Sequence, residues 1–584
     1  MAQGVVQDKV ADVLASALRL AQQRGILKIE QMPVINLEAP KRPEWGDVSC
    51  TVAMSLSASE RRPPFEIAQI IADHIQDRDV LFSRVDIARP GFLNLTLKSD
   101  LWMEVLRHIE TQRAEYGHSR LGQGRRVLVE YVSANPTGPL HVGHGRGAAV
   151  GQALVRLLRA TGHEVVSEYY INDAGRQMKL LGVSVLTRYL EACGQTVPFP
   201  EDGYQGEYIR AVAARIKAEQ GVALLSLSSG DAEQRSKDFA YRELLALIRQ
   251  DLETFGITFE SWFSEASLLS SGAVEQVLGE LKSRDLLFDQ DGAQWFRSSA
   301  YGDEKDRVVR KQEGEYTYLA SDIAYHRDKL RRGFDLLVDV WGADHHGYIP
   351  RMQAVVQAYG YPKERLRVVL VQMVNLLRGG RKVEMSKRAG EFITLREVMD
   401  EVGADAAKFF FLMRDSSTHL DFDLELAKQQ SQENPVYYVQ YAHARISSLL
   451  RVAASRGIDC PLPSQADLKQ LDDPDELAII RKLSVFPVVL ESSAVELEPH
   501  RMAYYLRELA GLVHPFYNKH RILPPITDLD TTPAASTESS ASTSRVPEAV
   551  PPGLTGARLA LMWSVQQVVR NGLTVLGVSA PEQM

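Results

Sequence analysis

Cysteine is scarce in this chain. Only Cys50, Cys193 and Cys460 occur among 584 residues, and they lie far apart with no Cys-x-x-Cys pair. Disulfide frameworks and structural zinc sites both depend on cysteines at close, paired spacings. The sequence therefore argues against both, and we expect no structural metal.

Long apolar runs are also missing. No stretch of about 20 apolar residues exists to cross a bilayer. The first residues, MAQGVVQDKVADV, lack a basic region followed by an apolar one. We therefore expect no membrane attachment and a cytoplasmic location. At 584 residues the chain is too long for a single core, so roughly two to four domains are expected.

An excess of positive charge is the third absence. The net charge of −8 excludes a general basic coat of the kind that many nucleic-acid-binding proteins carry. Local patches would still suffice for such binding, because affinity depends on the few cations that meet phosphates. Candidate patches are Arg327, Lys329, Arg331 and Arg332, the loop from Arg378 to Arg388, and the C-terminal helices. A solvated helix face explains each patch equally well.

The most informative segment runs from Val127 to Gly147 and reads VLVEYVSANPTGPLHVGHGRG. Val127 to Val132 is typical of a buried parallel strand, and the Pro and Gly residues that follow would end it. From Gly145 the sequence has helical periodicity as far as Gly162, and His163 to Ile171 predicts the next strand. In such a β-loop-α-β unit the loop leads into a helix N-terminus that favours an anion. The segment therefore indicates nucleotide chemistry.

Two histidines stand at the mouth of this loop. His141 and His144 are three residues apart, so both imidazoles can face one bound phosphate. Gly143 between them lets a flat base or a ribose approach the backbone. A His-x-Gly-His sequence also arises by chance, and a single histidine is more often structural than catalytic. The place of this one at a strand-to-helix turn favours a catalytic site.

At this point the chain resembles a known family. The segment SANPTGPLHVGHGR, which contains His141-Val142-Gly143-His144, resembles the HIGH element of the class I aminoacyl-tRNA synthetases in its arginine-specific form. Far downstream, Glu384-Met385-Ser386-Lys387-Arg388 resembles the second class I element, KMSKS. Here Glu384 stands in place of the first lysine and Arg388 in place of the final serine. The resemblance to the arginyl-tRNA synthetases covers nearly the whole chain, including its last residues, GVSAPEQM.

The resemblance implies an α/β fold with three domains. A small N-terminal α/β domain that binds the tRNA elbow is expected over residues 1–112, and a class I synthetase Rossmann-like parallel-sheet catalytic domain over 113–415. A C-terminal α-helical bundle that binds the anticodon is expected over 416–584. Residues of about 195–300 are more helical and polar than the segments around them, which suits a connective insertion.

One segment departs from the family pattern. Residues 524–553 are poor in apolar groups and rich in Ser, Thr, Ala and Pro, so they cannot bury enough surface to become ordered. We expect a disordered insertion there, followed by a final helix from about Thr555 to Gly577.

Local patterns predict the remaining elements. Pro and Gly mark the turns, and the period of the apolar residues separates helices from strands. The predicted helices are Val5 to Arg24, Phe65 to Ile75 and one that opens at Asn434-Pro435, and the predicted strands are those around Arg89-Pro90-Gly91 in Val80 to Leu97, and Leu336 to His346 and Leu366 to Leu376.

Four residues are candidates for contact with tRNA. The resemblance places Phe92 and Asn94 on the surface that meets the elbow, although a turn that only shapes a strand explains them equally well. The helix opened by Asn434-Pro435 carries Tyr438 and Tyr441 among cations, a pattern that can stack on splayed bases. Aromatic residues at helical spacing are also typical of a core.

Arginine recognition has its own candidates. A guanidinium is best bound by a carboxylate that accepts two parallel hydrogen bonds, beside a phenol. Tyr318 and Asp322 offer that pair in YTYLASDIAYHRDKLRR, with Ser321 placed to cap the helix. Without the resemblance, Asp322 would be interpreted as a charge favoured by a helix N-terminus. The resemblance assigns Tyr318 and Asp322 to the side chain of arginine, and it assigns the rest of the amino acid to Glu130, Ser133 and Asn135.

The resemblance also implies the reaction. ATP activates L-arginine to arginyl-adenylate, and the arginyl group then passes to the 2′-OH of the terminal adenosine of tRNA(Arg). His141 and His144 would serve the α-phosphate and the nucleoside, while Ser386 and Lys387 would hold the leaving phosphates. Because Glu384 is not a lysine, Lys387 carries more of the charge or nearby cations assist it. Mg²⁺ is expected only with ATP. The ATP-binding set is completed by Gly143, Gly145 and Met385.

Alternatives from other classes remain. Small nucleotidylyltransferases use the same histidine turn but lack a long helical C-terminal domain. A synthetase-like RNA-binding or scaffolding protein without aminoacylation activity would have no physical need for His141, His144 and Lys387. Trp341 to His346 looks metal-like, but the resemblance makes it a strand end that lines the pocket. A monomer is expected.

Overall fold

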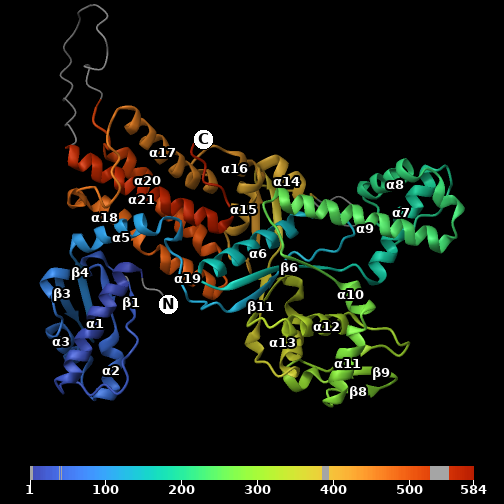
Figure 1. Ribbon diagram of the computed structural model, residues 1–584, viewed down its shortest axis with the longest axis horizontal. Coiled ribbons are helices and arrows are strands. Elements are labelled where there is room, and N and C mark those ends of the chain that lie inside the picture. Colours follow the sequence, from blue (N-terminus) through green and yellow to red (C-terminus); the bar gives the residue numbers. More distant parts are fainter. Residues whose placement is uncertain (1–3, 39, 41, 384–392, 526–550) are drawn as a thin grey trace, which may run out of the picture.

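The computed structural model describes residues 4–38, 40, 42–383, 393–525 and 551–584 (Figure 1). The chain begins with a small α/β unit, at the lower left of Figure 1, whose antiparallel sheet has the order β1-β2-β4-β3. The predicted first helix is confirmed, and β3 and β4 are the strands predicted around Arg89-Pro90-Gly91, paired antiparallel. The elements of the unit are α1 (Val5–Gln23), β1 (Leu37–Glu38), β2 (Val48–Cys50), α2 (Val52–Glu60), α3 (Pro64–Asp73), α4 (Arg78–Leu81), β3 (Phe82–Ala88), β4 (Phe92–Leu97) and α5 (Ser99–Gln112).

The centre of the molecule is a five-stranded parallel sheet with the order β12-β11-β5-β6-β7. Its middle strand is buried on both faces: Val127 and Val129 join one hydrophobic core, and Leu128 joins another. This alternation follows from the opposite directions of successive side chains in a strand. The strands are β5 (Arg126–Glu130), β6 (Glu164–Ile171), β7 (Ser261–Ser264), β11 (Leu336–Gly342) and β12 (Leu366–Val371).

Helix α6 (Val142–Ala160) connects β5 to β6. The periodicity predicted a start at Gly145, but the helix begins three residues earlier, at Val142. The reason is the cap, since the ring of His141 accepts the backbone N–H groups of Gly143 and His144. Histidine is not among the usual N-cap residues, so the sequence did not mark this start.

An arm of three helices projects to the right in Figure 1 and encloses a small core of its own. The expected helical insertion over about 195–300 is interrupted, because β7 lies within it and pairs with β6 in the central sheet. A separate lobe follows β7. The arm consists of α7 (Gly175–Ala192), α8 (Glu207–Gln220) and α9 (Ser229–Thr254), and the lobe begins with α10 (Glu265–Ser270), α11 (Ala273–Ser283), β8 (Leu287–Gln290), β9 (Ala293–Phe296) and β10 (Arg307–Arg310).

The prediction of one strand from Leu366 to Leu376 was wrong. The chain leaves the central sheet after β12, and the next residues enter a second sheet with the order β14-β13-β15. Both pieces are apolar, so composition alone did not show the break. The remaining elements of the catalytic body are α12 (Tyr318–Arg331), α13 (Ile349–Ala358), β13 (Val374–Arg378), β14 (Arg381–Lys382), α14 (Leu395–Val402), α15 (Ala404–Leu412), β15 (Leu420–Asp423) and α16 (Leu424–Lys428).

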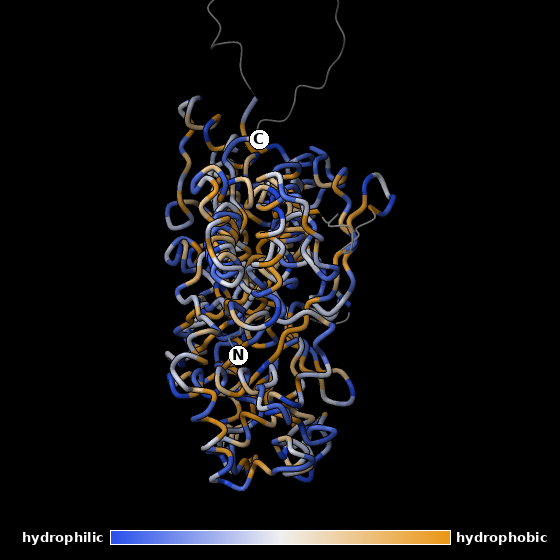
Figure 2. Tube along the Cα trace, turned by 90° about the vertical axis from the view of Figure 1, so that its right-hand side faces the viewer, coloured by the Kyte–Doolittle hydropathy of each residue, from blue (hydrophilic) through white to orange (hydrophobic). Residues whose placement is uncertain are grey.

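The C-terminal part is a helical bundle that packs on α5 and α6 through its last helix. The predicted disordered insertion falls largely on residues 526–550, which lie outside the described residues. Hydrophobic residues recur along the whole height of the molecule (Figure 2). No described helix is long and apolar enough to span a membrane. The bundle consists of α17 (Pro435–Ser455), α18 (Pro474–Ser484), α19 (Phe486–Glu496), α20 (His500–Lys519) and α21 (Pro552–Leu576).

The packing of α6 against its neighbours can be tested by substituting two glycines of this helix. A Cβ at Gly151 would overlap the buried ring of Tyr131, whereas a Cβ at Gly147 would meet nothing within 4 Å. We expect Gly151→Ala to destabilise the protein by about 1–3 kcal/mol through overpacking. Gly147→Ala should be neutral or stabilise by up to about 1 kcal/mol, because alanine favours a helix. Thermal unfolding of both variants checks this, and equal midpoints would contradict the packing.

Candidate functional site

The turn after β5 carries the two histidines. The rings of His141 and His144 stack with their centroids 3.6 Å apart and their planes 19° apart. Nδ1 of His141 accepts the N–H of Gly143 at 3.1 Å, and Nδ1 of His144 accepts the N–H of His141 at 3.3 Å. A ring nitrogen that accepts a backbone N–H carries no proton, so each neutral ring has its proton on Nε2. The two rings are therefore set as Nε2–H donors at a helix N-terminus.

The second signature element lies outside the described residues, and with it Met385, Ser386 and Lys387. The chain that leaves it returns directly to the histidine turn. Leu395 donates its N–H to the carbonyl of Leu140 at 2.7 Å, and Thr394 forms a β-bridge with His141. These bonds join the histidine turn to the residues that follow the second signature element in the sequence.

Gly145 explains how closely these regions approach. A Cβ at this position would lie 2.6 Å from Cδ1 of Leu395, in the first turn of α14. Thr394 caps that helix in a capping box with Glu397. A side chain at 145 would therefore have to displace the side chain of Leu395. The structure gives this predicted ATP-binding residue a packing role as well.

Arg146 is a contributor that the sequence analysis missed. Its side chain is fully buried in α6 and donates to the carbonyl of Gln372 at 2.9 Å, of Thr418 at 2.8 Å and of Asp415 at 2.9 Å. Burial lowers the pKa of Arg146 to about 10, and Asp415 opposes that shift. The three carbonyls flank β13 and β15, so Arg146 ties the histidine helix to the second sheet.

The candidate residues for binding the side chain of arginine lie in α12 or follow strands of the central parallel sheet. Tyr348, just beyond β11, donates its hydroxyl to Asp322 in α12. Burial raises the pKa of Asp322, while the hydrogen bond from Tyr348 acts in the opposite direction. Tyr318 is the first residue of α12 and is 66% exposed. Ser321 does not cap this helix as predicted, because Thr317 occupies the N-cap position.

A second carboxylate joins Asp322. Glu265 follows β7 directly, is only 6% exposed, and has its pKa raised to about 7 by burial and by the charges of Asp322 and Asp173. Asp173 follows β6. Among the described residues, none of these three carboxylates forms an ion pair with Lys or Arg. The edge of the sheet therefore presents concentrated negative charge, which suits a guanidinium.

Sequence reasoning missed Glu265 and Tyr348 because their partners are remote in the chain. A signal was present only in part, since Glu265 directly follows β7 and Tyr348 ends the turn after β11, and both strands belong to the parallel sheet. Ligands bind at the carboxyl edge of such sheets.

The predicted ligands of the amino and carboxyl groups of arginine lie around the end of β5. Ser133 donates its hydroxyl to Glu130 at 2.8 Å, and Asn135 donates its amide to Gln177 at 2.7 Å. Val132 and Ser133 both have positive φ, of 70° and 40°. Such angles are costly for residues other than glycine and cluster at functional sites.

The predicted basic patch on α12 was wrong for most of its members. Lys329 is fully buried and bonds Glu130 at 2.6 Å and Asp339 at 2.8 Å. Arg332 pairs with Glu168, and Arg327 pairs with Glu280. Helical spacing turns these cations toward carboxylates of the body, so they are not available to tRNA phosphates.

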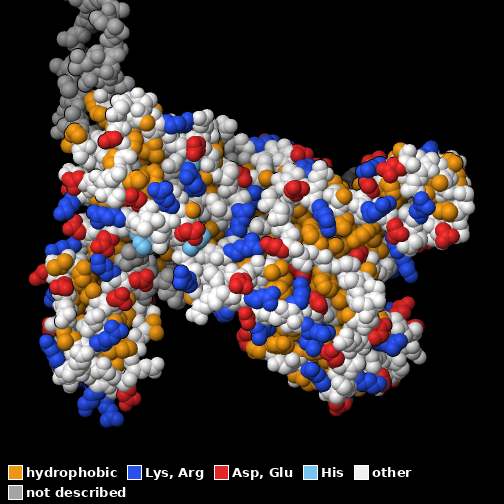
Figure 3. Space-filling view, viewed as in Figure 1, with side chains coloured by type: hydrophobic (Ala, Val, Ile, Leu, Met, Phe, Trp, Pro, Cys, Tyr) orange, Lys and Arg blue, Asp and Glu red, His pale blue; other side chains and the backbone are white. Residues whose placement is uncertain are grey.

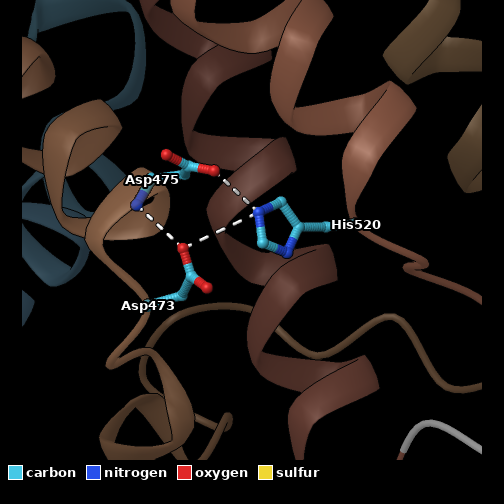
Figure 4. Close-up of side chains that lie close together, drawn as sticks. All are labelled: Asp473, Asp475 and His520. Atoms are coloured by element: carbon cyan, nitrogen blue, oxygen red, sulfur yellow. Dashed lines mark hydrogen bonds and ion pairs between the residues drawn. The ribbon is translucent and has the colours of Figure 1, made fainter.

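The candidate metal ligands divide between two places. His345 and His346 lie exposed in the turn after β11, and no cluster of three ligating groups forms there among the described residues. Asp473, Asp475 and His520 do gather in the helical bundle (Figure 4). Lys519 also bonds Asp475, at 2.6 Å, and Asp473 caps α18. These ion pairs and the cap account for the cluster without a metal.

The four candidate tRNA contacts differ in exposure. Asn94 is buried and accepts a hydrogen bond from Ser49, while Phe92 is half-buried in the same sheet. Tyr438 packs on His514, and Tyr441 is 37% exposed beside Tyr437. Tyr441 is thus the most accessible of the four.

Comparisons with known protein families identify three successive domains along the chain. Residues 106–423 match the family described as tRNA synthetases class I (R), catalytic domain. Residues 5–97 match the arginyl tRNA synthetase N-terminal domain, and residues 439–584 match the DALR anticodon-binding domain. Together with the parallel sheet and its histidine turn, these matches define a class I aminoacyl-tRNA synthetase.

Individual relatives narrow the class. The chain is 48% identical over 560 residues to the arginine–tRNA ligase of Citrifermentans bemidjiense, covering 96% of this chain and 97% of the relative. It is 47% identical over 575 residues to that of Nitratidesulfovibrio vulgaris, covering 98% and 99%. The chain belongs to the arginyl-tRNA synthetase family, and its activity is that of an arginine–tRNA ligase. The resemblance, the fold class and the enzyme class predicted from the sequence are confirmed.

Solved structures show the same fold. A putative arginyl-tRNA synthetase from Campylobacter jejuni is 34% identical with a TM-score of 0.73, and the match covers 84% of this chain and all of that one. The Thermus thermophilus arginyl-tRNA synthetase has a TM-score of 0.71 at 22% identity, over 99% of this chain and all of that one. The second likeness concerns the fold alone.

The two tasks of His141 can be separated by substitution. Asparagine is a good N-cap, so His141→Asn should unfold within about 0.5 kcal/mol of the parent, whereas His141→Ala should lose about 1 kcal/mol. Both should lower arginine-dependent pyrophosphate exchange about 100-fold or more, because neither offers the Nε2–H donor. Full exchange activity in His141→Asn would show that His141 serves only as a helix cap.

Proposed function

We propose that this chain catalyses both steps of aminoacylation at the carboxyl edge of its parallel sheet. L-Arginine and ATP react there to form arginyl-adenylate, and the arginyl group then passes to the 2′-OH of the terminal adenosine of tRNA(Arg). The proposal is supported by the bonding of the histidine turn to residues 393–395 and by the carboxylates that follow β6 and β7 in the same parallel sheet. We assign the phosphates of ATP to the first and the guanidinium of arginine to the second.

In the first step, a carboxylate oxygen of arginine attacks the α-phosphorus of ATP, and the bond to the pyrophosphate oxygen breaks. His141 and His144 donate Nε2–H groups to the α-phosphate and the nucleoside as negative charge spreads. Gly143 leaves room for the nucleotide at the backbone, and Gly145 and Met385 complete the proposed ATP-binding set. Ser386 and Lys387 hold the departing pyrophosphate. Mg²⁺ arrives with ATP and is held mainly by phosphate oxygens, and it neutralises part of their charge.

Recognition of arginine rests on charge. Asp322 and Glu265 accept hydrogen bonds from the guanidinium, with Tyr348 orienting Asp322 and Tyr318 closing the entrance. Two carboxylates favour the planar guanidinium, because it presents several N–H donors at fixed angles. Glu130, Ser133 and Asn135 bind the amino and carboxyl groups.

Contact with tRNA uses separate surfaces. Acidic and basic side chains alternate over the face seen in Figure 3, which also shows a recess between the N-terminal unit and the α10–α13 lobe. We expect Phe92 to meet the elbow, and Tyr438 and Tyr441 to meet the anticodon, whereas the burial of Asn94 leaves it a role within its own sheet. We further propose that the enzyme works as a monomer in the cytoplasm. Sedimentation with and without tRNA tests the oligomeric state.

The central experiment is pyrophosphate exchange into ATP, in the presence of tRNA(Arg), with arginine or lysine as the amino acid. We expect exchange with arginine and not with lysine, and a large loss in His144→Ala and Lys387→Ala. Equal exchange with lysine would remove the arginine assignment. Unchanged exchange in both variants would leave a synthetase-like RNA-binding protein as the better description.

The raised pKa of Glu265, about 7, gives a prediction about pH. The guanidinium stays charged at all relevant pH values, whereas Glu265 becomes ionised as the pH rises through 7. The KM for arginine should therefore fall between about pH 6 and pH 8. Glu265→Gln should raise the KM about tenfold or more and flatten this dependence.

Glu275→Gln is the matched control for this measurement. Glu275 lies in α11 of the same lobe and bonds the hydroxyl of Tyr316. The Glu275→Gln variant should have the same KM for arginine, and the same dependence of that KM on pH, as the parent enzyme. A flat profile in the parent enzyme would contradict the role of Glu265.

A further inference from the structure

A continuous chain of hydrogen bonds links the two ends of the proposed arginine site. It starts at the backbone carbonyl of Asp322, which lies 2.9 Å from Nδ1 of His326 in α12. Nε2 of His326 lies 3.0 Å from a carboxylate oxygen of Asp339 in β11. The other oxygen of Asp339 accepts from Nζ of Lys329 at 2.8 Å, and Lys329 also donates to Oε2 of Glu130 at 2.6 Å. Oε1 of Glu130 accepts the hydroxyl of Ser133.

Lys329 is the centre of this chain. Its side chain is fully buried, and its ammonium lies 4.3 Å from the ring centre of Tyr325. Burial opposes the ionisation of Asp339, but Lys329 and His326 together hold the pKa of Asp339 at about 2. A desolvated ammonium is costly unless it is paired on several sides. Here two carboxylates and an aromatic face surround it.

The orientation of Glu130 depends on Lys329. Each carboxylate oxygen of Glu130 is bonded to a different element, Oε1 to Ser133 in the turn after β5 and Oε2 to Lys329 in α12. The group therefore cannot rotate. An oxygen of a carboxylate accepts about two hydrogen bonds, so each keeps the capacity for one more. An ammonium group is the donor that a buried carboxylate at this place best accommodates.

We infer that Lys329 is a positioning residue for the substrate: it fixes Glu130 in the orientation that binds the α-ammonium group of L-arginine. The inference rests on the proposed function, which assigns Glu130 to that group. Lys329 belongs to the helix that carries Asp322, so it also sets the separation between the carboxylates at the two ends of arginine.

The test compares two ligands that differ at one group. L-Arginine carries the α-ammonium, whereas 5-guanidinopentanoic acid lacks it and keeps the guanidinium and the carboxylate. In calorimetric titrations of the full-length enzyme, we expect Lys329→Met to weaken L-arginine about tenfold or more. The affinity for 5-guanidinopentanoic acid and the KM for ATP should stay within about twofold. Equal weakening of both ligands would overturn the inference.

Lys408→Met is the matched control. Lys408 is a buried lysine in α15 that bonds the carbonyl of Gly577, outside the proposed pocket. It should change thermal stability without changing the ratio of the two affinities. If Lys329→Met does not fold, Lys329→Gln takes its place, since its amide still fills the space. The same selective loss is then expected, and its absence counts against Lys329.

Glu130→Gln separates this inference from the proposed function. If Glu130→Gln leaves the affinity for L-arginine unchanged, the proposed role of Glu130 fails and the inference fails with it. If Glu130→Gln weakens L-arginine but Lys329→Met does not, only the inference fails. The double variant should bind L-arginine as Glu130→Gln does, because Lys329 acts through that carboxylate.

Discussion

The site depends on a short backbone junction. Leu140 to Val142 pair with Ile393 to Leu395, so the start of α6 and the start of α14 are joined by main-chain bonds. The absence of a side chain at Gly145 allows that approach. Main-chain bonds resist sliding more than side-chain contacts do, because moving the pair by one residue would break every bond at once. The histidine turn and residues 393–395, which follow the second signature in the sequence, are thereby held together.

Opposite kinds of electrostatics meet at this edge. The turn after β5 presents Nε2–H donors and a helix N-terminus, both of which favour phosphate. The ends of β6 and β7 present Asp173 and Glu265, which favour a cation. Carboxylates buried without an ion pair cost stability, as the raised pKa of Glu265 indicates. In the proposed function an entering guanidinium relieves that cost, so the selectivity for arginine would have its origin in the unfavourable burial of these carboxylates.

Periodicity predicted what is local. The first helix, the strands β5, β6 and β11, and the helix opened by Asn434-Pro435 all follow from patterns within about 20 residues. The early start of α6 and the break after β12 depend on partners elsewhere in the chain, and they were missed or placed wrongly. Glu265, Tyr348 and Arg146 escaped notice for the same reason. The partners of Arg146 are 226 or more residues away.

Helix α12 shows which signal sequence reasoning could still have used. Tyr318, Asp322, His326 and Lys329 follow one another at intervals of four, four and three residues, which places them on one side of a helix. The residues between them, such as Leu319 and Ile323, are buried in the hydrophobic core. Polar groups on a helix that is also apolar cannot all be solvated, so they must pair with buried partners or with a ligand. These four residues of α12 illustrate both cases. Lys329 pairs with carboxylates of the sheet, whereas Asp322 lies near another buried carboxylate, Glu265.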